Sequence, residues 1–325
     1  MDSFLSVQSL SKQIGQRLAV SDVSFECSRF GKMAIVGETG SGKSTLMKMI
    51  GGLVQPDTGA VYYEGIRVLG PNERLIPGHP KIGYLSQYFE LRNNYRVHEL
   101  MEMVNQLPEE RAGQIYEVCQ VDHLLQRWTH ELSGGEKQRI SLAKLLTTSP
   151  GLLLLDEPFS NFDLPHKRTM QQVIKDVGAE LSISVLLVSH DAQDVLSWAD
   201  TLLVLQEGRV IQQGAVQEVY RRPVNHYAAA LLGQMQLLSS CVVAAITGSN
   251  AEALPEQLLM RPEWIQLSTE HGAAATVQQV NFCGNYYLLL VQCAGAEVYV
   301  QVQKNPPLPG DNVLLTADAA DVWYW

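Results

Sequence analysis

The hydrophobic positions in the first two-thirds of the chain follow two periods, and each predicts a different kind of strand. Every residue is apolar at Met33–Val36, Leu152–Leu155 and Val185–Val188, which indicates strands buried on both faces. In Ala19–Cys27 apolar and polar residues alternate, which is typical of a strand with one exposed face. Gly59–Val68 also reads as β structure and turns at Gly65. Because helical patterns separate the fully apolar runs, the chain is expected to begin with an α/β domain built on a parallel sheet.

The helical patterns lie between and after these strands. Ser44–Ile50 and Val216–Leu232 read as helical segments, and Val97–Leu146 reads as helical with interleaved polar positions. Thr201–Leu205 and Arg209–Ile211 predict a hairpin that turns at a Glu-Gly pair.

Short β-branched runs return after Cys241, separated by turn signals rich in glycine, asparagine and proline. This spacing predicts a small all-β barrel or sandwich. We therefore expect two domains, 1–235 and 236–325. The four predicted strands of the second domain are Thr276–Phe282, Tyr286–Gln292, Glu297–Gln303 and Asn312–Thr316.

The charge of the chain bears on the partners that it can bind. The 325 residues carry 24 Lys and Arg against 34 Asp and Glu, a formal net charge of −10. From Ser240 onwards the only basic residues are Arg261 and Lys304, against eight acidic ones. Nucleic-acid binders neutralise phosphates with Lys and Arg, so this balance argues against general nucleic-acid binding.

Cysteine usage and hydropathy exclude several other classes. The five cysteines are scattered without a C-x-x-C pair, which argues against a zinc site or a disulfide framework and favours a reducing cytosol. No signal peptide is evident at the N-terminus. The most apolar stretch, Ala228–Ile246, is interrupted by polar residues and is a poor membrane span.

A glycine-rich segment follows the first apolar run and precedes the first helix. Gly37-Glu-Thr-Gly-Ser-Gly-Lys-Ser44 fits the pattern G-x-x-x-x-G-K-S/T in the strand-to-helix context that the pattern requires. Glycines let backbone N–H groups curl around phosphate oxygens, and the helix N-terminus adds partial positive charge. Lys43 is placed to reach the β- and γ-phosphates, and Ser44 offers an oxygen to Mg²⁺.

Two carboxylates end the second apolar run. Asp156, at the strand tip, is placed to bind Mg²⁺ directly or through water, and Glu157 is placed to polarise an attacking water as a general base. Together with the glycine-rich segment, this pair predicts a nucleotide hydrolase.

A second glycine-containing segment narrows the class of hydrolase. Ser133-Gly134-Gly135 precedes an amphipathic helix and resembles another anion-binding helix N-terminus. One chain with one phosphate loop has no obvious use for a second γ-phosphate cradle, whereas two copies arranged head to tail do.

The order of these motifs resembles that of the ATP-binding subunits of ATP-binding cassette (ABC) transporters, and the resemblance covers residues 1–235. It rests on phosphate loop 37–45, Gln87, signature 132–136, the Asp156-Glu157 pair, Asp163 and His190. It implies a P-loop NTPase cassette, with a RecA-like core, an antiparallel β subdomain and a helical subdomain. Two cassettes would sandwich two ATP molecules, so the signature of one copy would contact the nucleotide of the other.

The resemblance also implies roles for single residues. Gln87 would touch Mg²⁺ and link the site to the helical subdomain. Asp163 would act at the dimer interface, with a simple helix N-cap as the alternative. His190 would contact the γ-phosphate and hold the attacking water, so the implied catalytic residues are Glu157, His190 and Lys43. The implied Mg²⁺ ligands are Ser44, Gln87 and Asp156. The implied nucleotide-binding residues are Gly37, Glu38, Thr39, Gly40, Ser41, Gly42, Lys43, Ser44, Thr45, Gln87, Ser133, Gly134, Gly135, Asp163 and Ile14.

The chain departs from the family pattern in two places. Ile14 stands where the family commonly stacks an aromatic residue on adenine, so base affinity or selectivity is expected to be loose. The segment after Gln87, from Tyr88 to Asn94, lacks the aromatic–Pro pair of many importer relatives. That surface normally meets the membrane subunit, which suggests a partner of an unusual subtype.

The C-terminal segment carries a resemblance of its own. Arg261-Pro262-Glu263 and the later Pro309-Gly-Asp311 resemble importer ATPases that carry a C-terminal OB-like (TOBE) domain. OB folds often bind oligonucleotides. With two basic residues from Ser240 onwards, a structural or regulatory dimerisation role is the expected one.

These observations predict a homodimeric Mg²⁺–ATP hydrolase, peripheral at the cytoplasmic face of the cell membrane, that drives solute import. The expected partners are a second copy, transmembrane permease subunits and, through them, an extracytoplasmic solute-binding protein. The resemblance is to ATPases that serve sugars, polyamines, sulfate or iron. Three alternatives remain: the same motor on an exporter, a soluble ABC protein acting in nucleic-acid repair or translation, and a nucleotide-sensing ABC interaction module.

Overall fold

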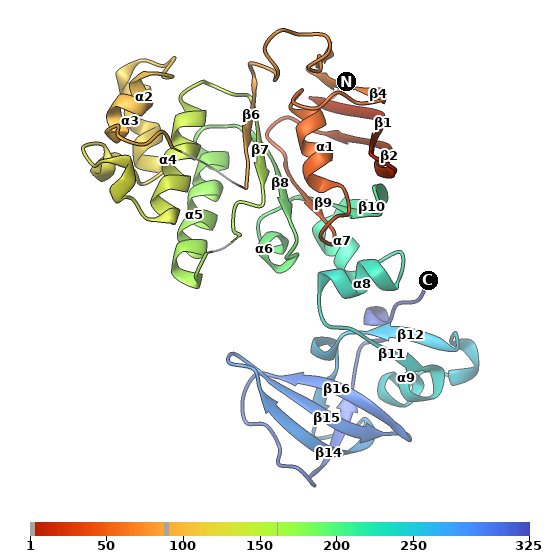
Figure 1. Ribbon diagram of the computed structural model, residues 1–325. Coiled ribbons are helices and arrows are strands. Elements are labelled where there is room, and N and C mark those ends of the chain that lie inside the picture. Colours follow the sequence, from red (N-terminus) through yellow and green to blue (C-terminus); the bar gives the residue numbers. More distant parts are fainter. Residues whose placement is uncertain (1–3, 88–90, 161) are drawn as a thin grey trace. The chain divides into compact units, whose positions relative to one another are not determined.

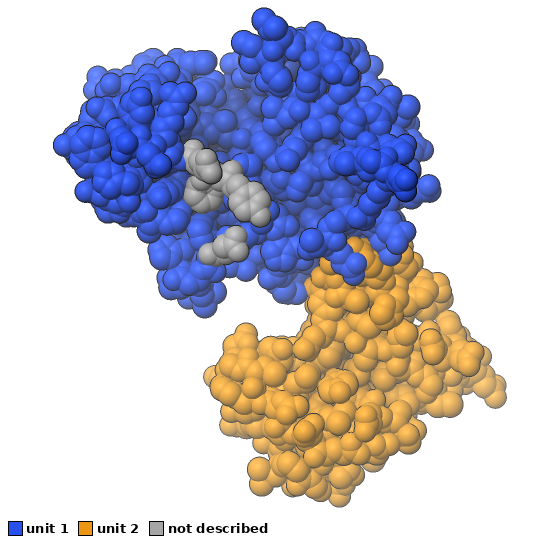
Figure 2. All heavy atoms as spheres, viewed as in Figure 1, with its two compact units in different colours: residues 1–216 blue, residues 217–325 orange. Residues whose placement is uncertain are grey.

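The computed structural model describes residues 4–87, 91–160 and 162–325. The chain divides into two compact units, residues 1–216 and residues 217–325 (Figure 2). The sequence-based boundary lay at 235/236, so the helical segment before it groups with the second unit. The boundary of the functional cassette itself stays a prediction.

The first unit is centred on a mixed sheet, six-stranded within the described residues, with the order β10-β9-β3-β8-β7-β6 (Figure 1). All neighbours are parallel except the β9–β10 hairpin. The strands β3, β7 and β8 are almost wholly buried, as their uninterrupted apolar sequences predict. The strands are β3 (Lys32–Val36), β6 (Ile82–Leu85), β7 (Leu152–Asp156), β8 (Ser184–Ser189), β9 (Thr201–Gln206) and β10 (Arg209–Ala215).

A second, antiparallel sheet completes the core of this unit, with the order β2-β1-β4-β5. Its inward-facing residues share one hydrophobic cluster with β3, β7, β8, β9 and the first helix. Its strands are β1 (Leu5–Ile14), β2 (Arg17–Cys27), β4 (Thr58–Tyr63) and β5 (Ile66–Arg67).

The helices of the first unit flank the parallel sheet. Figure 1 shows α2 and α3 grouped beyond the β6 edge, on the side away from the antiparallel sheet. The helices are α1 (Lys43–Ile50), α2 (Val97–Glu102), α3 (Glu109–Val118), α4 (Gly134–Leu146), α5 (Leu164–Glu180) and α6 (Gln193–Leu196).

The second unit is built around an antiparallel sheet with the order β13-β17-β14-β15-β16, and β11 pairs with β12 in a small separate sheet. Alternate residues of these strands join helix α9 in a core of their own. The strands are β11 (Gln236–Ser239), β12 (Gln257–Met260), β13 (Gln266–Ser268), β14 (Ala273–Phe282), β15 (Tyr287–Cys293), β16 (Ala296–Val302) and β17 (Asn312–Thr316), and the helices are α7 (Val216–Arg221), α8 (His226–Leu232) and α9 (Ser240–Thr247).

The predicted fold class is confirmed, and the helical stretch expected at Val216–Leu232 is helical but interrupted. The segment forms two helices, α7 and α8, and the break contains Pro223. Proline has no N–H for the helix ladder and disfavours helical geometry in the residue before it. Asn225 then starts α8, because its side chain accepts a hydrogen bond from the N–H of Ala228 at 2.9 Å.

No helix among the described residues has both the length and the apolar character that crossing a bilayer requires. The apolar stretch at 228–246 is divided between α8, β11 and α9.

A buried arginine ties the helical start of the second unit to its β structure. Arg261, whose side chain is fully buried, donates hydrogen bonds to the backbone oxygens of Gln234 (3.0 Å), Tyr220 (3.2 Å) and Ala229 (3.2 Å). Its guanidinium carbon lies 3.9 Å from the centre of the Tyr220 ring and 5.7 Å from that of Trp264. Burial lowers the pKa of Arg261, and the nearby Tyr220 and Glu263 act against that shift.

We predict that Arg261→Met destabilises the second unit. The substitution keeps the aliphatic length but removes the donors, and each buried carbonyl left without a partner costs about 1–3 kcal/mol. The free energy of unfolding should fall by about 2–4 kcal/mol, measured by urea denaturation of the full chain. Lys304→Met, which removes the exposed cation of the same region, is the matched control. Equal midpoints for the two variants would contradict the structural role of Arg261.

Candidate functional site

The glycine-rich segment 37–42 connects β3 to α1, and two of its glycines have no room for a side chain. A Cβ on Gly37 would lie 2.3 Å from the Leu205 backbone oxygen. On Gly42 it would lie 2.1 Å from the Ala19 backbone oxygen, and Gly42 also has a φ of 103°. Only glycine satisfies both constraints, so these residues fix the loop that opens α1.

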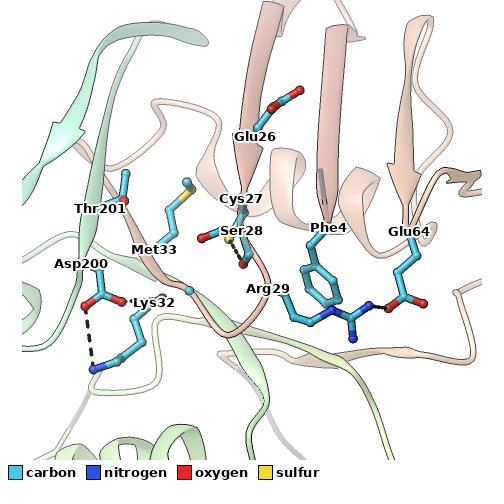
Figure 3. Close-up of a pocket in the computed structure, with 11 residues that line it drawn as sticks. Phe4, Glu26, Cys27, Ser28, Arg29, Lys32, Met33, Glu64, Asp200 and Thr201 are labelled. Carbon is cyan, nitrogen blue, oxygen red and sulfur yellow. Dashed lines mark hydrogen bonds and ion pairs between the residues drawn. The ribbon is translucent and has the colours of Figure 1, made fainter. Parts of the chain in front are cut away.

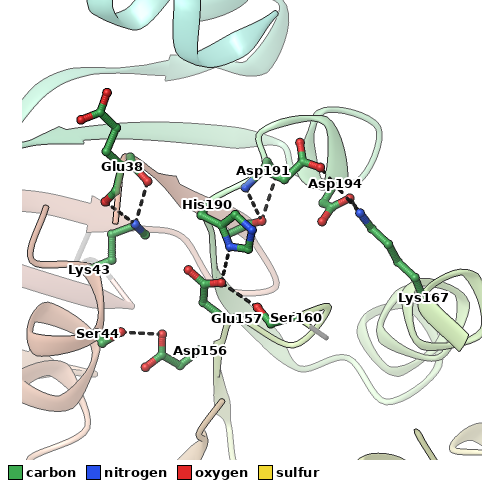
Figure 4. Close-up of polar contacts among 12 residues, drawn as sticks. Glu38, Lys43, Ser44, Asp156, Glu157, Ser160, Lys167, His190, Asp191 and Asp194 are labelled. Atoms are coloured by element: carbon green, nitrogen blue, oxygen red, sulfur yellow. Dashed lines mark hydrogen bonds and ion pairs between the residues drawn. The ribbon is translucent and has the colours of Figure 1, made fainter. Parts of the chain in front are cut away.

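Lys43 is buried inside this loop (Figure 4). Its Nζ donates hydrogen bonds to the backbone oxygens of Gly37 (2.7 Å) and Glu38 (2.8 Å). Burial lowers the pKa of Lys43, while the carboxylates of Glu157, Asp156 and Glu38 act to raise it. The cation therefore lies between the loop backbone and the carboxylates that end β7.

The Asp156 side chain, 4% exposed, ends β7 and holds two hydrogen bonds. Ser44 Oγ donates to Oδ1 at 2.9 Å, and Tyr84 Oη donates to Oδ2 at 2.7 Å. Tyr84 lies on the neighbouring parallel strand β6. Burial and the Asp156 carboxylate both raise the pKa of Tyr84, so its hydroxyl keeps the proton that it donates.

Glu157 follows Asp156 in a sharp turn, with a φ of 52° and its N–H bonded to the Val188 oxygen of β8. Its Oε2 accepts a hydrogen bond from Ser160 Oγ at 2.7 Å. The same oxygen contacts Nδ1 of His190, which directly follows β8 (Figure 4). Because β7 and β8 are parallel neighbours, their ends bring the predicted base and histidine together.

A cavity of about 600 Å³ opens over these groups. Its lining includes many of the residues singled out from the sequence, namely Ile14, Thr39, Gly40, Gly42, Lys43, Ser44, Thr45, Gln87, Glu157 and His190. In the loop beneath, Ser41 Oγ is a buried oxygen without a hydrogen-bond partner in the described part of the chain. A hydroxyl donor in this position, next to backbone that excludes any side chain, suits an anion such as a phosphate.

Arg17 also lines this cavity, and the sequence analysis did not identify it. Its guanidinium donates to the Gly40 oxygen at 2.6 Å, so it lies over the phosphate loop. Ile14, at 55% exposure, lies on the preceding strand. The sequence shows Arg17 three residues after Ile14, the expected adenine contact. Its position over the phosphate loop is set by the β1–β2 hairpin, which the sequence analysis did not establish.

The signature residues and Asp163 do not line the cavity. Ser133 caps α4, and Glu136 completes a capping box by accepting from the Ser133 N–H at 2.7 Å. Asp163 caps α5 and also contacts His166 Nδ1 at 2.5 Å, so the N-cap alternative describes what this residue does within one copy. A Cβ on Gly135 would lie 2.9 Å from the His166 ring, so the glycine lets the two segments pack closely.

Gln138, which the sequence analysis also missed, links helix α4 to the turn that contains Glu157. Its buried side chain donates to the Pro158 oxygen at 2.8 Å, one residue after Glu157. The segment that departs from the family pattern after Gln87 begins with residues 88–90, which lie outside the described residues.

A cavity of similar volume, about 630 Å³, lies elsewhere in the first unit (Figure 3). Four of its charged groups form pairs, Arg29 with Glu64 and Lys32 with Asp200 at 4.0 Å. The Cys27 thiol in its wall has its pKa raised to about 11, mainly by burial and also by Asp200, and it is therefore a poor nucleophile. This cavity lacks the convergent donors of the first one.

The donor set at the first cavity suits Mg²⁺. No group of three or more His, Cys, Asp or Glu side chains that could hold a metal ion occurs in 4–87, 91–160 or 162–325. Mg²⁺ is commonly held by one or two protein oxygens together with substrate phosphates. Ser44 Oγ and Asp156 Oδ1, which lie 2.9 Å apart, are such oxygens. Gln87 lines the cavity and can supply another.

Comparisons with known proteins agree with this geometry. The model of the ABC transporter family matches residues 20–160, and that of the TOBE domain matches residues 258–325. The Fe(3+) ions import ATP-binding protein FbpC of Pseudomonas fluorescens is 32% identical over 92% of this chain and 90% of its own length. The glucose import ATP-binding protein GlcV of Saccharolobus solfataricus is 34% identical over 79% of this chain and 77% of its own length.

Solved structures show the same cassette fold. The ADP conformation of an ATP-binding cassette of an ABC transporter aligns with a TM-score of 0.58 and 25% identity, covering 67% of this chain and 95% of that one. The expected family, its import-type relatives and the TOBE domain are thus confirmed, and the exporter alternative gains no support. The chain belongs to the ATP-binding subunits of ABC transporters, ATPases of the import type that carry a C-terminal TOBE domain.

Proposed function

We propose that this chain hydrolyses Mg²⁺–ATP in a homodimer and thereby drives solute import through membrane permease subunits. The contact between Glu157 and His190, at the edge of a cavity floored by the phosphate loop, carries the proposal. A carboxylate beside an imidazole and a phosphate-binding loop suits water activation.

In this proposal the phosphate loop binds the ATP triphosphate, and Lys43 exchanges its contacts with Gly37 and Glu38 for phosphate oxygens. Glu157 takes the proton of the attacking water. His190 orients Glu157 and holds the water toward the γ-phosphate. Ser44, Asp156 and Gln87 would hold Mg²⁺, which when bound neutralises charge on the phosphate oxygens.

The position of the signature residues supports the proposed dimer. Ser133, Gly134 and Gly135 open α4 but do not line the cavity of their own chain. A helix N-terminus offers N–H groups and partial positive charge, so it suits the γ-phosphate bound by a second copy. Asp163 and His166, packed against Gly135, would lie beside that interface.

The place of action and the partners rest on the relatives. FbpC, GlcV and the sulfate/thiosulfate protein CysA are named as import ATP-binding proteins, although their cargoes differ. We infer attachment to permease subunits at the cytoplasmic face of the membrane, with a solute-binding protein delivering cargo from outside. Because similar cassettes serve different cargoes, we infer that other subunits select the solute.

We predict that Glu157→Gln lowers ATP turnover by at least about 100-fold, the contribution of a general base, without loss of ATP binding. The variant should form a stable ATP-bound dimer, because bound nucleotide is no longer cleaved. Phosphate release and size-exclusion chromatography with ATP measure the two effects. Glu180→Gln, an exposed change of the same chemistry on α5, should leave both unchanged. Unaltered turnover in Glu157→Gln would refute the assignment of the base.

We further predict that Arg17→Ala weakens ATP binding by about 5- to 20-fold, because a guanidinium face compensates for the missing aromatic residue at the position of Ile14. Arg17→Lys should resemble Arg17→Ala, since lysine keeps the charge but loses the planar face. Titration with a fluorescent ATP analogue in the Glu157→Gln background measures the affinity, and Arg209→Ala on β10 is the control. Full affinity in Arg17→Lys would instead point to a charge contact with phosphate.

A further inference from the structure

The Asp156 carboxylate has a second anchor besides the phosphate-loop serine. Tyr84 Oη donates to Oδ2 at 2.7 Å, on the oxygen opposite the one that Ser44 Oγ contacts. Each carboxylate oxygen thus holds one neutral donor from a different element, β6 on one side and α1 on the other.

The terminal torsion of an aspartate side chain otherwise takes a broad range of values. One hydrogen bond on each carboxylate oxygen restricts that torsion and fixes the plane of the carboxylate. Asp156 is 4% exposed, so water has little access to replace either donor. Loss of the tyrosine hydroxyl would leave Oδ2 of a buried carboxylate with one partner fewer and allow the group to rotate. The orientation of a metal ligand depends on such outer contacts.

The strand that carries Tyr84 also leads to Gln87. β6 ends at Leu85, two residues before Gln87, and Gln87 lines the nucleotide cavity. β6 runs parallel to β7, with Tyr84 paired to Leu154 and Leu85 paired to Leu155. The end of β6 and the residues just after it therefore supply both Gln87, which lines the cavity, and Tyr84, which bonds the carboxylate at the end of β7.

We propose that Tyr84 is a positioning residue that orients Asp156 for Mg²⁺–ATP and ties that orientation to the strand leading to Gln87. The inference rests on the proposed Mg²⁺–ATP function of the cavity. Tyr84 contacts neither nucleotide nor metal in this role and acts only through Asp156.

The ring of Tyr84 has a separate packing function that the test must leave intact. It is half-buried and packs against the core cluster shared by the two sheets of the first unit. Tyr84→Phe keeps the ring and removes only the hydroxyl, so core packing is preserved. Tyr116→Phe on α3 makes the same chemical change away from the cavity and serves as the control.

The experiment measures metal affinity directly, in full-length protein carrying Glu157→Gln so that ATP is not consumed. Mn²⁺ replaces Mg²⁺ as the probe, and its binding to the ATP-loaded protein is followed by electron paramagnetic resonance. Tyr84→Phe should weaken Mn²⁺ binding by about 10- to 100-fold, as loss of an outer contact to a metal ligand does elsewhere. Affinity for ATP in EDTA should match that of the parent. The thermal unfolding midpoint should fall by only a few degrees, because one hydrogen bond is lost, and the variant should remain folded at the assay temperature.

The outcomes separate this inference from the function on which it rests. If the parent fails to bind Mn²⁺ with ATP, the proposed metal site itself is wrong. If the parent binds and Tyr84→Phe binds equally well, only the role of Tyr84 is overturned. If Tyr84→Phe weakens ATP binding in EDTA to the same degree as Mn²⁺ binding, the tyrosine acts on the loop as a whole and the inference also fails.

Discussion

The proposed nucleotide site depends on keeping one carboxylate, that of Asp156, buried at the end of an apolar strand. Burying a polar group without hydrogen bonds costs several kcal/mol, so the site must supply donors from inside the protein. It does so from both neighbours in space, α1 through Ser44 and β6 through Tyr84. Lys43, buried close by, adds a favourable charge. The phosphate loop and the end of β7 are therefore parts of one hydrogen-bonded structure.

The parallel register of the central sheet makes this arrangement possible. The ends of β3, β7 and β8 meet at one edge, which places the phosphate loop, the Asp156-Glu157 pair and His190 side by side although they are far apart in the sequence. Such an edge is where open α/β sheets bind ligands. Gln138 extends the connection from the turn after β7 to the helix that carries the signature residues.

Much of this could be predicted from the sequence, for clear physical reasons. Uninterrupted apolar runs identified β3, β7 and β8, and the glycine-rich segment identified the loop between β3 and α1. β6 escaped notice because Gly83 and Tyr84 interrupt its apolar run, and Arg17 and Tyr84 escaped because their partners are set by strand pairing, which one sequence does not reveal. Pro223 was visible, but the helical period around it concealed the break between α7 and α8.

The buried position of Arg261 affects how such chains can be recombined. Its hydrogen bonds reach back to Tyr220, Ala229 and Gln234, all before the stretch matched as a TOBE domain, which starts at residue 258. Exchanging that stretch alone between relatives would join the arginine of one parent to the helices of another. A crossover at 216/217, where the chain divides into compact units, would transfer helices and arginine together. The segment that must be exchanged as one unit is therefore defined by the contacts of Arg261. It is longer than the stretch matched as a TOBE domain.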